Sequence, residues 1–227
     1  MTHKMDSMLT PTTPAELAEA VRSAPRVIAV GAGTKPRLAR VADEFVRVST
    51  ERLRGIVEYE PSEFTFTALA GTPLRDIVAA LAERGQYLPF DPPWAEAGAT
   101  IGGTVAAGLN GAGRFRFGGQ RDFILGVRFV DGGGRLLRLG GKVVKNAAGF
   151  DLPKFFVGSL GRFGVLAEMT FKVFPRPAAA RTVRIAAGDI AAAVRVLTEA
   201  ASARWELDAL EAGLAEGAVY ARLAGPG

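Results

Sequence analysis

A glycine-rich stretch, residues 98–111, constrains the fold of this chain more than any other feature. It mixes glycines with small and β-branched residues and contains no charged side chain. Glycine has no Cβ, so the backbone N–H groups of such a stretch can approach a ligand closely. The stretch therefore suits an extended phosphate-bearing ligand better than a catalytic constellation. Taken alone, it fits a packed glycine-rich turn equally well.

Two further glycine segments, Val30–Lys35 and Gly158–Gly164, favour the ligand interpretation. A P-loop is excluded, because Lys35 is followed by Pro36 and not by serine or threonine. A Rossmann fingerprint needs three glycines before a helix, and the first segment has two. Glu51 stands at a suitable distance for a ribose-binding acid, but the remaining strands pair as meanders and hairpins, which disfavours a doubly wound sheet.

The missing residue types limit the chemistry. The chain has no cysteine, and its one histidine, His3, lies in the N-terminal tail. Disulfides, iron–sulfur clusters, ordinary zinc sites and Ser-His-Asp hydrolase chemistry are therefore not expected, and we predict no metal site. Redox chemistry would have to come from a bound organic cofactor. That cofactor cannot be attached through histidine or cysteine in the folded region.

The length and the net charge of the chain narrow the possible class of protein further. A chain of 227 residues allows one large domain, or one domain with a fragment of another. The net charge of +5 is dispersed, and Arg114–Phe117 is the nearest approach to a basic cluster, so we expect an anionic small ligand or an acidic partner and no nucleic acid. There is no apolar run of membrane-spanning length and no signal peptide, which favours a cytoplasmic location.

The pattern of apolar residues predicts an α+β chain whose second half is antiparallel. Residues 1–13 form a flexible tail, and a capping box at Thr13–Glu16 opens the first helix. We expect helices at 14–23, 72–85, 151–156 (capped by Asp151) and 190–201. The expected strands are 27–30, 45–49, 55–59, 64–70, 123–130, 135–139, 142–144, 165–174, 182–185, 206–211 and 218–223. Residues 131–134 (Asp-Gly-Gly-Gly) are expected to form the hairpin turn between strands 123–130 and 135–139.

The prolines at 175 and 177 predict a domain boundary. Residues 178–227 then read as β-α-β-β, the start of a ferredoxin-like unit. This order indicates either a truncated second domain or an unusually short one. The expected organisation is thus a tail (1–13), a main domain (14–177) and a partial C-terminal cap (178–227).

Six motifs together resemble a known family. The chain is similar to the PCMH-type FAD-binding domain of the vanillyl-alcohol oxidase/p-cresol methylhydroxylase superfamily, and within it to the small FAD-binding subunits of bacterial glycolate oxidases. The resemblance covers about residues 14–177. The motifs are 30–35, 88–93, 99–108, 121–126, 144–151 and 158–168.

The resemblance implies a fold of two α+β subdomains with FAD bound non-covalently in the cleft between them. Backbone amides of the first glycine segment would meet the pyrophosphate, the second segment would continue the cradle and line the flavin side, and the third would approach from the opposite subdomain. The implied residues are Gly31, Ala32, Gly33, Thr34, Lys35, Thr100, Gly102, Gly103, Val105, Ala106, Gly161, Gly164 and Val165. Each glycine could instead serve a turn.

The implied activity is that of an FAD-dependent oxidoreductase acting on CH–OH groups. The chain would be the FAD-binding subunit of a 2-hydroxy-acid (glycolate) oxidase or dehydrogenase complex, whose flavin accepts a hydride equivalent and passes electrons to a partner. The expected partners are a larger flavoprotein subunit and an iron–sulfur subunit, which could hold the chain peripherally at the inner face of the membrane.

Two departures from the family pattern leave alternatives open. Gly108 stands where many relatives carry asparagine. The C-terminal cap is short, so no catalytic residues can be carried over. A non-catalytic FAD-holding or electron-relay subunit therefore remains an alternative, and a stand-alone NAD(P)H reductase is a remote one.

Five other side chains are candidates for ligand contacts. Lys145 beside Asn146 could orient a carboxylate, or could be a solvated lysine before a turn. Arg114, Arg116 and Arg121 could pair with the cofactor or substrate, although most surface arginines do neither.

Overall fold

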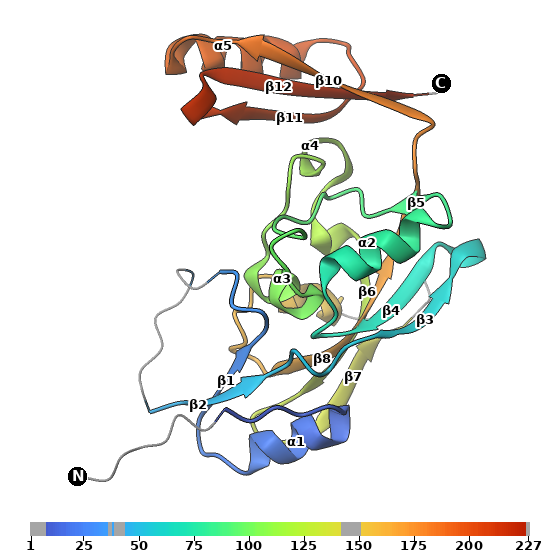
Figure 1. Ribbon diagram of the computed structural model, residues 1–227, viewed down its shortest axis with the longest axis vertical. Coiled ribbons are helices and arrows are strands. Elements are labelled where there is room, and N and C mark those ends of the chain that lie inside the picture. The colour runs from blue at the N-terminus through green and yellow to red at the C-terminus, as the bar shows by residue number, and fades with distance from the viewer. Residues whose placement is uncertain (1–7, 36–37, 39–43, 142–150, 226–227) are drawn as a thin grey trace.

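The computed structural model describes residues 8–35, 38, 44–141 and 151–225. Its main body is a five-stranded sheet with helices on both faces, and a smaller three-stranded sheet follows at the C-terminal end (Figure 1). The mixed α+β fold agrees with the prediction. The expected strand at 142–144 lies outside the described residues.

The five-stranded sheet is antiparallel throughout and has the order β3-β4-β8-β6-β7. Its strands are β3 (Ile56–Glu60), β4 (Thr65–Leu69), β6 (Ile124–Val130), β7 (Leu136–Gly140) and β8 (Val165–Lys172). β8 is central and buried on both faces, which explains its nearly continuous apolar sequence. The expected strand at 165–174 ends at Lys172, and a short β9 (Phe174–Pro175) then pairs with β5 (Gln86–Tyr87).

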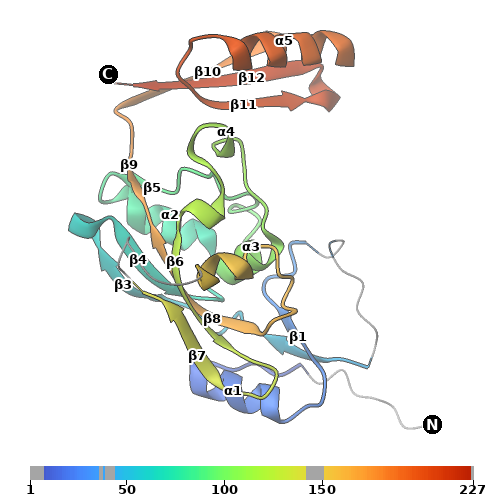
Figure 2. The same cartoon turned by 180° about the vertical axis from the view of Figure 1, so that it is seen from behind.

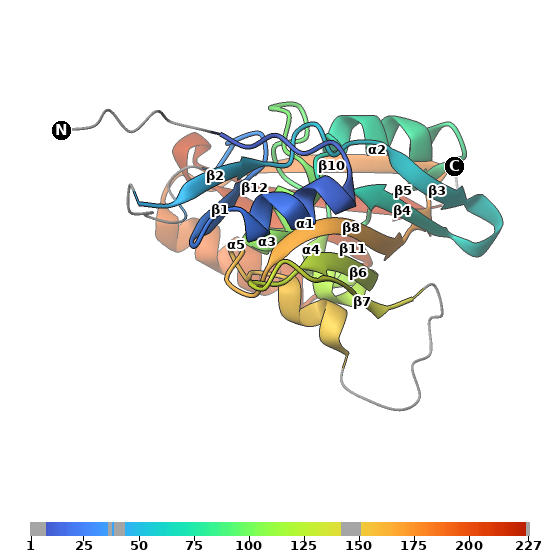
Figure 3. The same cartoon turned by 90° about the horizontal axis from the view of Figure 1, so that it is seen from below.

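Helices cover the two faces of this sheet (Figure 3). α1 (Pro14–Arg22) contacts β6 and β7 on one face, and α3 (Ile101–Ala107) contacts β4 and β8 on the other, where α2 (Leu74–Ala82) also lies. Between them, Phe66, Phe90 and Phe171 anchor the core, with the Phe90 and Phe171 ring centroids 6.0 Å apart. The same core contains Ile101 and Val105 and therefore fixes α3, the helix that carries the glycine-rich stretch.

The first two strands differ from the rest of the sheet. β1 (Val27–Val30) and β2 (Val46–Ser49) form a separate parallel pair beside α1. The capping box of α1 also differs from the expected form. Thr13 accepts from the Glu16 amide, but the Glu16 carboxylate reaches Thr12, which donates through its N–H (2.7 Å) and hydroxyl (2.9 Å). These bonds, led by the one from the Thr12 N–H, lower the pKa of Glu16.

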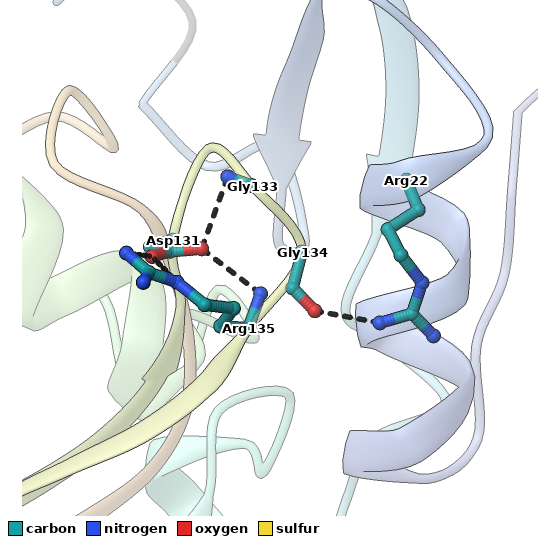
Figure 4. Close-up of polar contacts among 5 residues, drawn as sticks. All are labelled: Arg22, Asp131, Gly133, Gly134 and Arg135. Carbon is teal, nitrogen blue, oxygen red and sulfur yellow. Dashed lines mark hydrogen bonds and ion pairs between the residues drawn. The ribbon is translucent and has the colours of Figure 1, made fainter.

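The turn between β6 and β7 is fixed by a carboxylate and tied to α1 (Figure 4). Asp131 Oδ1 accepts from the amides of Gly133 (3.0 Å) and Arg135 (2.9 Å). The Gly134 carbonyl accepts from Arg22 Nη1 at 2.7 Å. The hairpin predicted at residues 131–134 is therefore confirmed, and it also anchors the first helix.

The C-terminal sheet has the predicted β-α-β-β order (Figure 2). It consists of β10 (Ala179–Ala186), α5 (Ile190–Ser202), β11 (Leu207–Gly213) and β12 (Ala218–Gly225), with the strand order β10-β12-β11. α5 packs on β11 and β12. α4 (Arg114–Phe117), from the main body, contacts β11.

One local expectation was wrong. Asp151 makes no side-chain cap; it forms an ion pair with Lys154 (2.8 Å), at the start of a 3-10 helix, η3 (Leu152–Phe156). One helix was not predicted, because the centre of the glycine-rich stretch forms α3. Three further 3-10 turns lie at η1 (Pro61–Glu63), η2 (Gln120–Asp122) and η4 (Leu214–Glu216).

Candidate cofactor site

The first two glycine segments meet where β1 ends and α3 begins. Thr50 donates its amide to the Val30 carbonyl (2.8 Å) and so fixes the end of β1. A Cβ on Gly31 would lie 2.5 Å from Thr100 Oγ1, so the two backbones approach more closely than a side chain would allow. Thr100 is the N-cap of α3. Glycine at position 31 therefore permits the contact between the loop and the helix.

The loop of residues 31–35 presents backbone amides. Among the described residues, none of these five amides has a hydrogen-bond acceptor. Ala32 and Gly33 are exposed, and Gly31, Thr34 and Lys35 are half-buried. Gly33 has φ +65°, a left-handed conformation that suits glycine. A row of free N–H groups with one residue in this conformation is the kind of backbone concavity that binds anions.

The amides at the start of α3 are already occupied. Ile101 donates to Thr72 O (3.0 Å), Gly102 to Ala70 O (2.9 Å) and Gly103 to Thr100 Oγ1 (3.3 Å). A Cβ on Gly102 would lie 2.8 Å from the Cβ of Ala70, so this glycine lets α3 pack against the end of β4. The free donors of the site therefore belong to residues 31–35, while Gly103 offers a half-buried surface beside them.

Lys35 adds a cation to the free amides. Its Nζ donates to Thr34 Oγ1 (3.1 Å) and lies 5.4 Å from the centroid of the Trp94 ring. Burial lowers the pKa of Lys35. Trp94 is half exposed and has φ +59°, a strained conformation for a bulky residue. Sequence reasoning missed Trp94, although it directly follows the Pro92–Pro93 pair.

The third glycine segment joins the other end of α3. Gly158 donates its amide to Val105 O (2.9 Å), and Leu160 donates to Ala106 O (2.9 Å). A Cβ on Gly108 would lie 2.9 Å from the Cα of Gly158. The glycine at position 108, where many relatives are expected to carry asparagine, therefore permits this contact. All three glycine segments form one continuous surface through α3.

The predicted residues within the third segment divide into two kinds. Gly161 is exposed, has φ +77°, and a Cβ there would meet nothing within 4 Å. Gly164 has φ +139°, and its Cβ would lie 2.5 Å from Val130 O, so the sheet requires glycine there. Val165 is buried and pairs with Val130 in the sheet, and Val105, which belongs to α3, is also buried. Of the predicted residues in the third segment, Gly161 is the one with open space beside it.

Buried polar atoms without partners gather around the same helix. Among the described residues, Thr104 Oγ1, Ser159 Oγ and Gln120 Oε1 are buried and have no hydrogen-bond partner. Thr104 is in α3, and Ser159 lies in the segment that docks on it. Buried polar groups in native proteins normally have partners. The groups that fit an anionic ligand are therefore the free amides of residues 31–35 and Lys35, because these lie on the accessible surface.

The other candidate side chains are not gathered here. Arg116 pairs with Glu206 (3.4 Å) and Asp208 (3.5 Å) of the C-terminal sheet. Arg114 and Arg121 are exposed and have no ion-pair partner among the described residues. Lys145 and Asn146 lie outside the described residues. In the part of the chain that the structure describes, no cluster of acidic, histidine or cysteine side chains could hold a metal ion.

The fold is a mixed α+β domain, and residues 31–35 and α3 form a glycine-rich surface with free backbone amides. The chain belongs to the family described as FAD binding domain, whose profile matches residues 5–140. It resembles glycolate oxidase subunit GlcE of Escherichia coli (strain K12), with 52% identity over 131 residues, which are 58% of this chain and 37% of the relative.

Two further similarities agree. Glycolate oxidase subunit GlcD of Bacillus subtilis (strain 168) is 30% identical over 154 residues, which cover 68% of this chain and 33% of that protein. The structure of an alkyldihydroxyacetonephosphate synthase matches with a TM-score of 0.77 at 19% identity, over 96% of this chain and 47% of that one. That likeness concerns the fold alone. The matched region spans about a third of the length of these curated relatives.

The family implies FAD, and the free amides and the ammonium of this site fit that cofactor. FAD carries a pyrophosphate, which the free amides of residues 31–35 and the ammonium of Lys35 can bind. No helix among the described residues is long and apolar enough to cross a membrane.

Proposed function

We propose that this chain is the FAD-binding subunit of a 2-hydroxy-acid oxidase or dehydrogenase complex, with glycolate as the first substrate to test. The observation that carries the proposal is the continuous surface from residues 31–35 through α3 to residues 158–161, with its free amides. The similarity to GlcE over 131 residues supports the same assignment.

Different residues of the site would bind different parts of the cofactor. The amides of residues 31–35 and Lys35 would bind the pyrophosphate, Trp94 would hold Lys35 in place, and Thr100 would fix the distance between the loop and α3. Gly103, Ala106 and Gly161 would shape the wall along the rest of the cofactor. When bound, FAD supplies the hydride-accepting redox chemistry that the side chains lack.

Phosphate recognition can be tested by comparing FAD, FMN and riboflavin in equilibrium titrations of the purified chain. Because the free donors are amides and an ammonium, we expect FAD to bind most tightly, FMN less tightly and riboflavin weakest. Lys35→Met is expected to reduce the preference for FAD over riboflavin, and Lys154→Met, on η3, serves as the control. Equal affinity for all three flavins would refute the phosphate site.

The catalytic role requires a separate test. Anaerobic addition of glycolate to the FAD-loaded chain should bleach the visible flavin absorption if the chain oxidises substrate itself. Bleaching only after a partner has been added would favour the second candidate, a non-catalytic FAD-holding or electron-relay subunit. That candidate is supported by the absence of histidine and cysteine among the described residues, which leaves no ordinary catalytic base of that kind.

The resemblance to glycolate oxidase subunits implies a larger flavoprotein subunit and an iron–sulfur subunit as the proposed partners. This chain has no cysteine to ligate a cluster itself. Through them the chain would act in the cytoplasm, peripherally at the inner face of the membrane. Co-expression with the products of neighbouring genes and affinity purification tests this arrangement. Failure to recover any flavoprotein or iron–sulfur protein would contradict it.

A further inference from the structure

One carboxylate, Asp91, joins three separate parts of the chain. Its Oδ2 accepts from the amide of Gly113 (2.9 Å), at the end of the glycine-rich stretch, and from Arg222 Nη2 (2.6 Å), on β12. The backbone of Gly111 is pressed against it, because a Cβ there would overlap the Asp91 carbonyl. Asp91 therefore contacts both the end of the glycine-rich stretch and the C-terminal sheet.

The loop that carries Asp91 is held in an unusual conformation. Asp91 has φ +46° and Trp94 has φ +59°, with Pro92 and Pro93 between them. Left-handed non-glycine residues persist only where their surroundings fix them. The bonds from Gly113 and Arg222 to the Asp91 side chain supply such fixing at one end of the loop.

The other end of the loop reaches the phosphate-binding amine. The Trp94 ring lies 5.4 Å from Lys35 Nζ. Proline restricts its own φ and the conformation of the residue before it, so a short loop with two prolines transmits a displacement instead of absorbing it. A shift of Asp91 would therefore move Trp94 and change the surroundings of Lys35.

We propose that Asp91 is a positioning residue that couples the docking of the C-terminal sheet, through Arg222, to the geometry of the cofactor site. The proposal rests on the proposed FAD site. Coupling of this kind is reciprocal. Removing the Arg222 contact weakens FAD binding, and FAD binding in turn tightens the docking of β12.

The structure offers a matched control. Glu206 also joins the C-terminal sheet to the main body, through Arg116 at 3.4 Å, but it does not contact Asp91. Glu206→Gln removes an ion pair between the same two parts and leaves the Asp91 loop intact. Asp91→Asn keeps the size of the side chain, its tolerance of the left-handed conformation and an acceptor for Gly113, and removes the charge that pairs with Arg222.

The experiment measures FAD affinity and Trp94 emission in a Trp205→Phe background, where Trp94 is the only tryptophan. Asp91→Asn and Arg222→Gln are each expected to weaken FAD binding by about fivefold or more, the lower end of ordinary coupling between sites. The double variant should be no weaker than the worse single one, because both remove one interaction. Glu206→Gln should bind FAD as the parent does.

Hydrogen exchange supplies the second readout. In the parent and in Glu206→Gln, FAD should slow amide exchange in residues 218–225, and in Asp91→Asn this slowing should be lost. Parental FAD affinity in Arg222→Gln, or additive losses in the double variant, would overturn the proposal. Arg222→Lys, with an intermediate effect expected, replaces Arg222→Gln if the latter unfolds.

A failure of the proposed coupling can be told apart from a failure of the proposed function. If the parent itself binds no FAD, the proposed function fails, and the coupling is read from the FAD-free protein. Arg222→Gln must then shift Trp94 emission and speed exchange of the Gly113 amide, while Glu206→Gln does neither. Unchanged emission and exchange in Arg222→Gln would overturn the coupling.

Discussion

Gly33 lies at the tip of the proposed phosphate loop, where substitution acts on the backbone alone. It has φ +65°, it is exposed, and a Cβ there would meet nothing within 4 Å. Alanine at this position creates no steric overlap, but it does not favour the left-handed conformation. The cost for an L-residue is about 1–2 kcal/mol, and asparagine tolerates the conformation better.

This conformational free energy sets the expected loss of FAD affinity. If the loop binds FAD only in the observed conformation, the apparent dissociation constant rises by the factor by which that conformation is depopulated. A cost of about 1–2 kcal/mol gives roughly a fivefold to thirtyfold loss for Gly33→Ala. Gly33→Asn should lose less, about threefold. The melting temperature should hardly change, because the loop has no hydrogen bonds from its amides among the described residues.

Flavin fluorescence titration and thermal melting by circular dichroism measure the two quantities. Gly188 provides the matched control, because it has φ +72° and equally open surroundings but lies in the C-terminal sheet unit. Gly188→Ala should leave FAD affinity unchanged. Parental affinity in Gly33→Ala would refute the role of this loop, and equal losses in the alanine and asparagine variants would show that the backbone conformation is not the cause.

Three further predictions concern neighbouring contacts. Burial lowers the pKa of Lys35, so its ammonium loses its proton at a lower pH than an ordinary lysine does. The affinity for FAD should therefore fall as the pH rises through that lowered pKa. The affinity of Lys35→Met should show no such fall. Gly31→Ala should displace the Thr100 hydroxyl and weaken FAD binding. In a double-mutant cycle, Thr100→Ala should partly relieve this loss. Additive losses in the double variant would argue against the contact. Gly134→Ala, at φ +73° and against the Arg22 side chain, should destabilise the protein by about 1–2 kcal/mol or more in urea unfolding, and a stability equal to that of the parent would contradict the observed turn.

The fold was largely predictable because its elements carry local signals. The Thr13 cap, the hairpin at residues 131–134 and the β-α-β-β order after Pro177 all depend on residues close together in the sequence. The parallel pairing of β1 with β2 was not predicted, because no local pattern determines which strand lies beside which. The α3 helix was missed because glycine disfavours helices, and tertiary packing against Ala70 outweighs that preference.

The segments that form the candidate site could be predicted from the sequence, but the contacts among their residues could not. The three glycine segments were identified from composition, and the structure brings them together along α3. Asp91 and Arg222 are 131 positions apart, and no periodicity links them. Trp94 gave a faint signal as an aromatic residue after two prolines. Its contact with Lys35 depends on a left-handed backbone that the sequence does not encode locally.

The surroundings of each glycine separate packing roles from ligand-facing ones, which the sequence pattern could not do. A Cβ on Gly102, Gly108 or Gly164 would lie within 3.0 Å of protein atoms, so the fold itself requires glycine there whether or not a cofactor binds. Gly33 and Gly161 have left-handed backbones and open space around the missing Cβ. Gly188 has the same left-handed backbone and the same open space outside the site, so Gly33 and Gly161 are distinguished by their place beside α3. Substitutions at the first group should therefore lower stability, and substitutions at the second should lower FAD affinity while stability is retained.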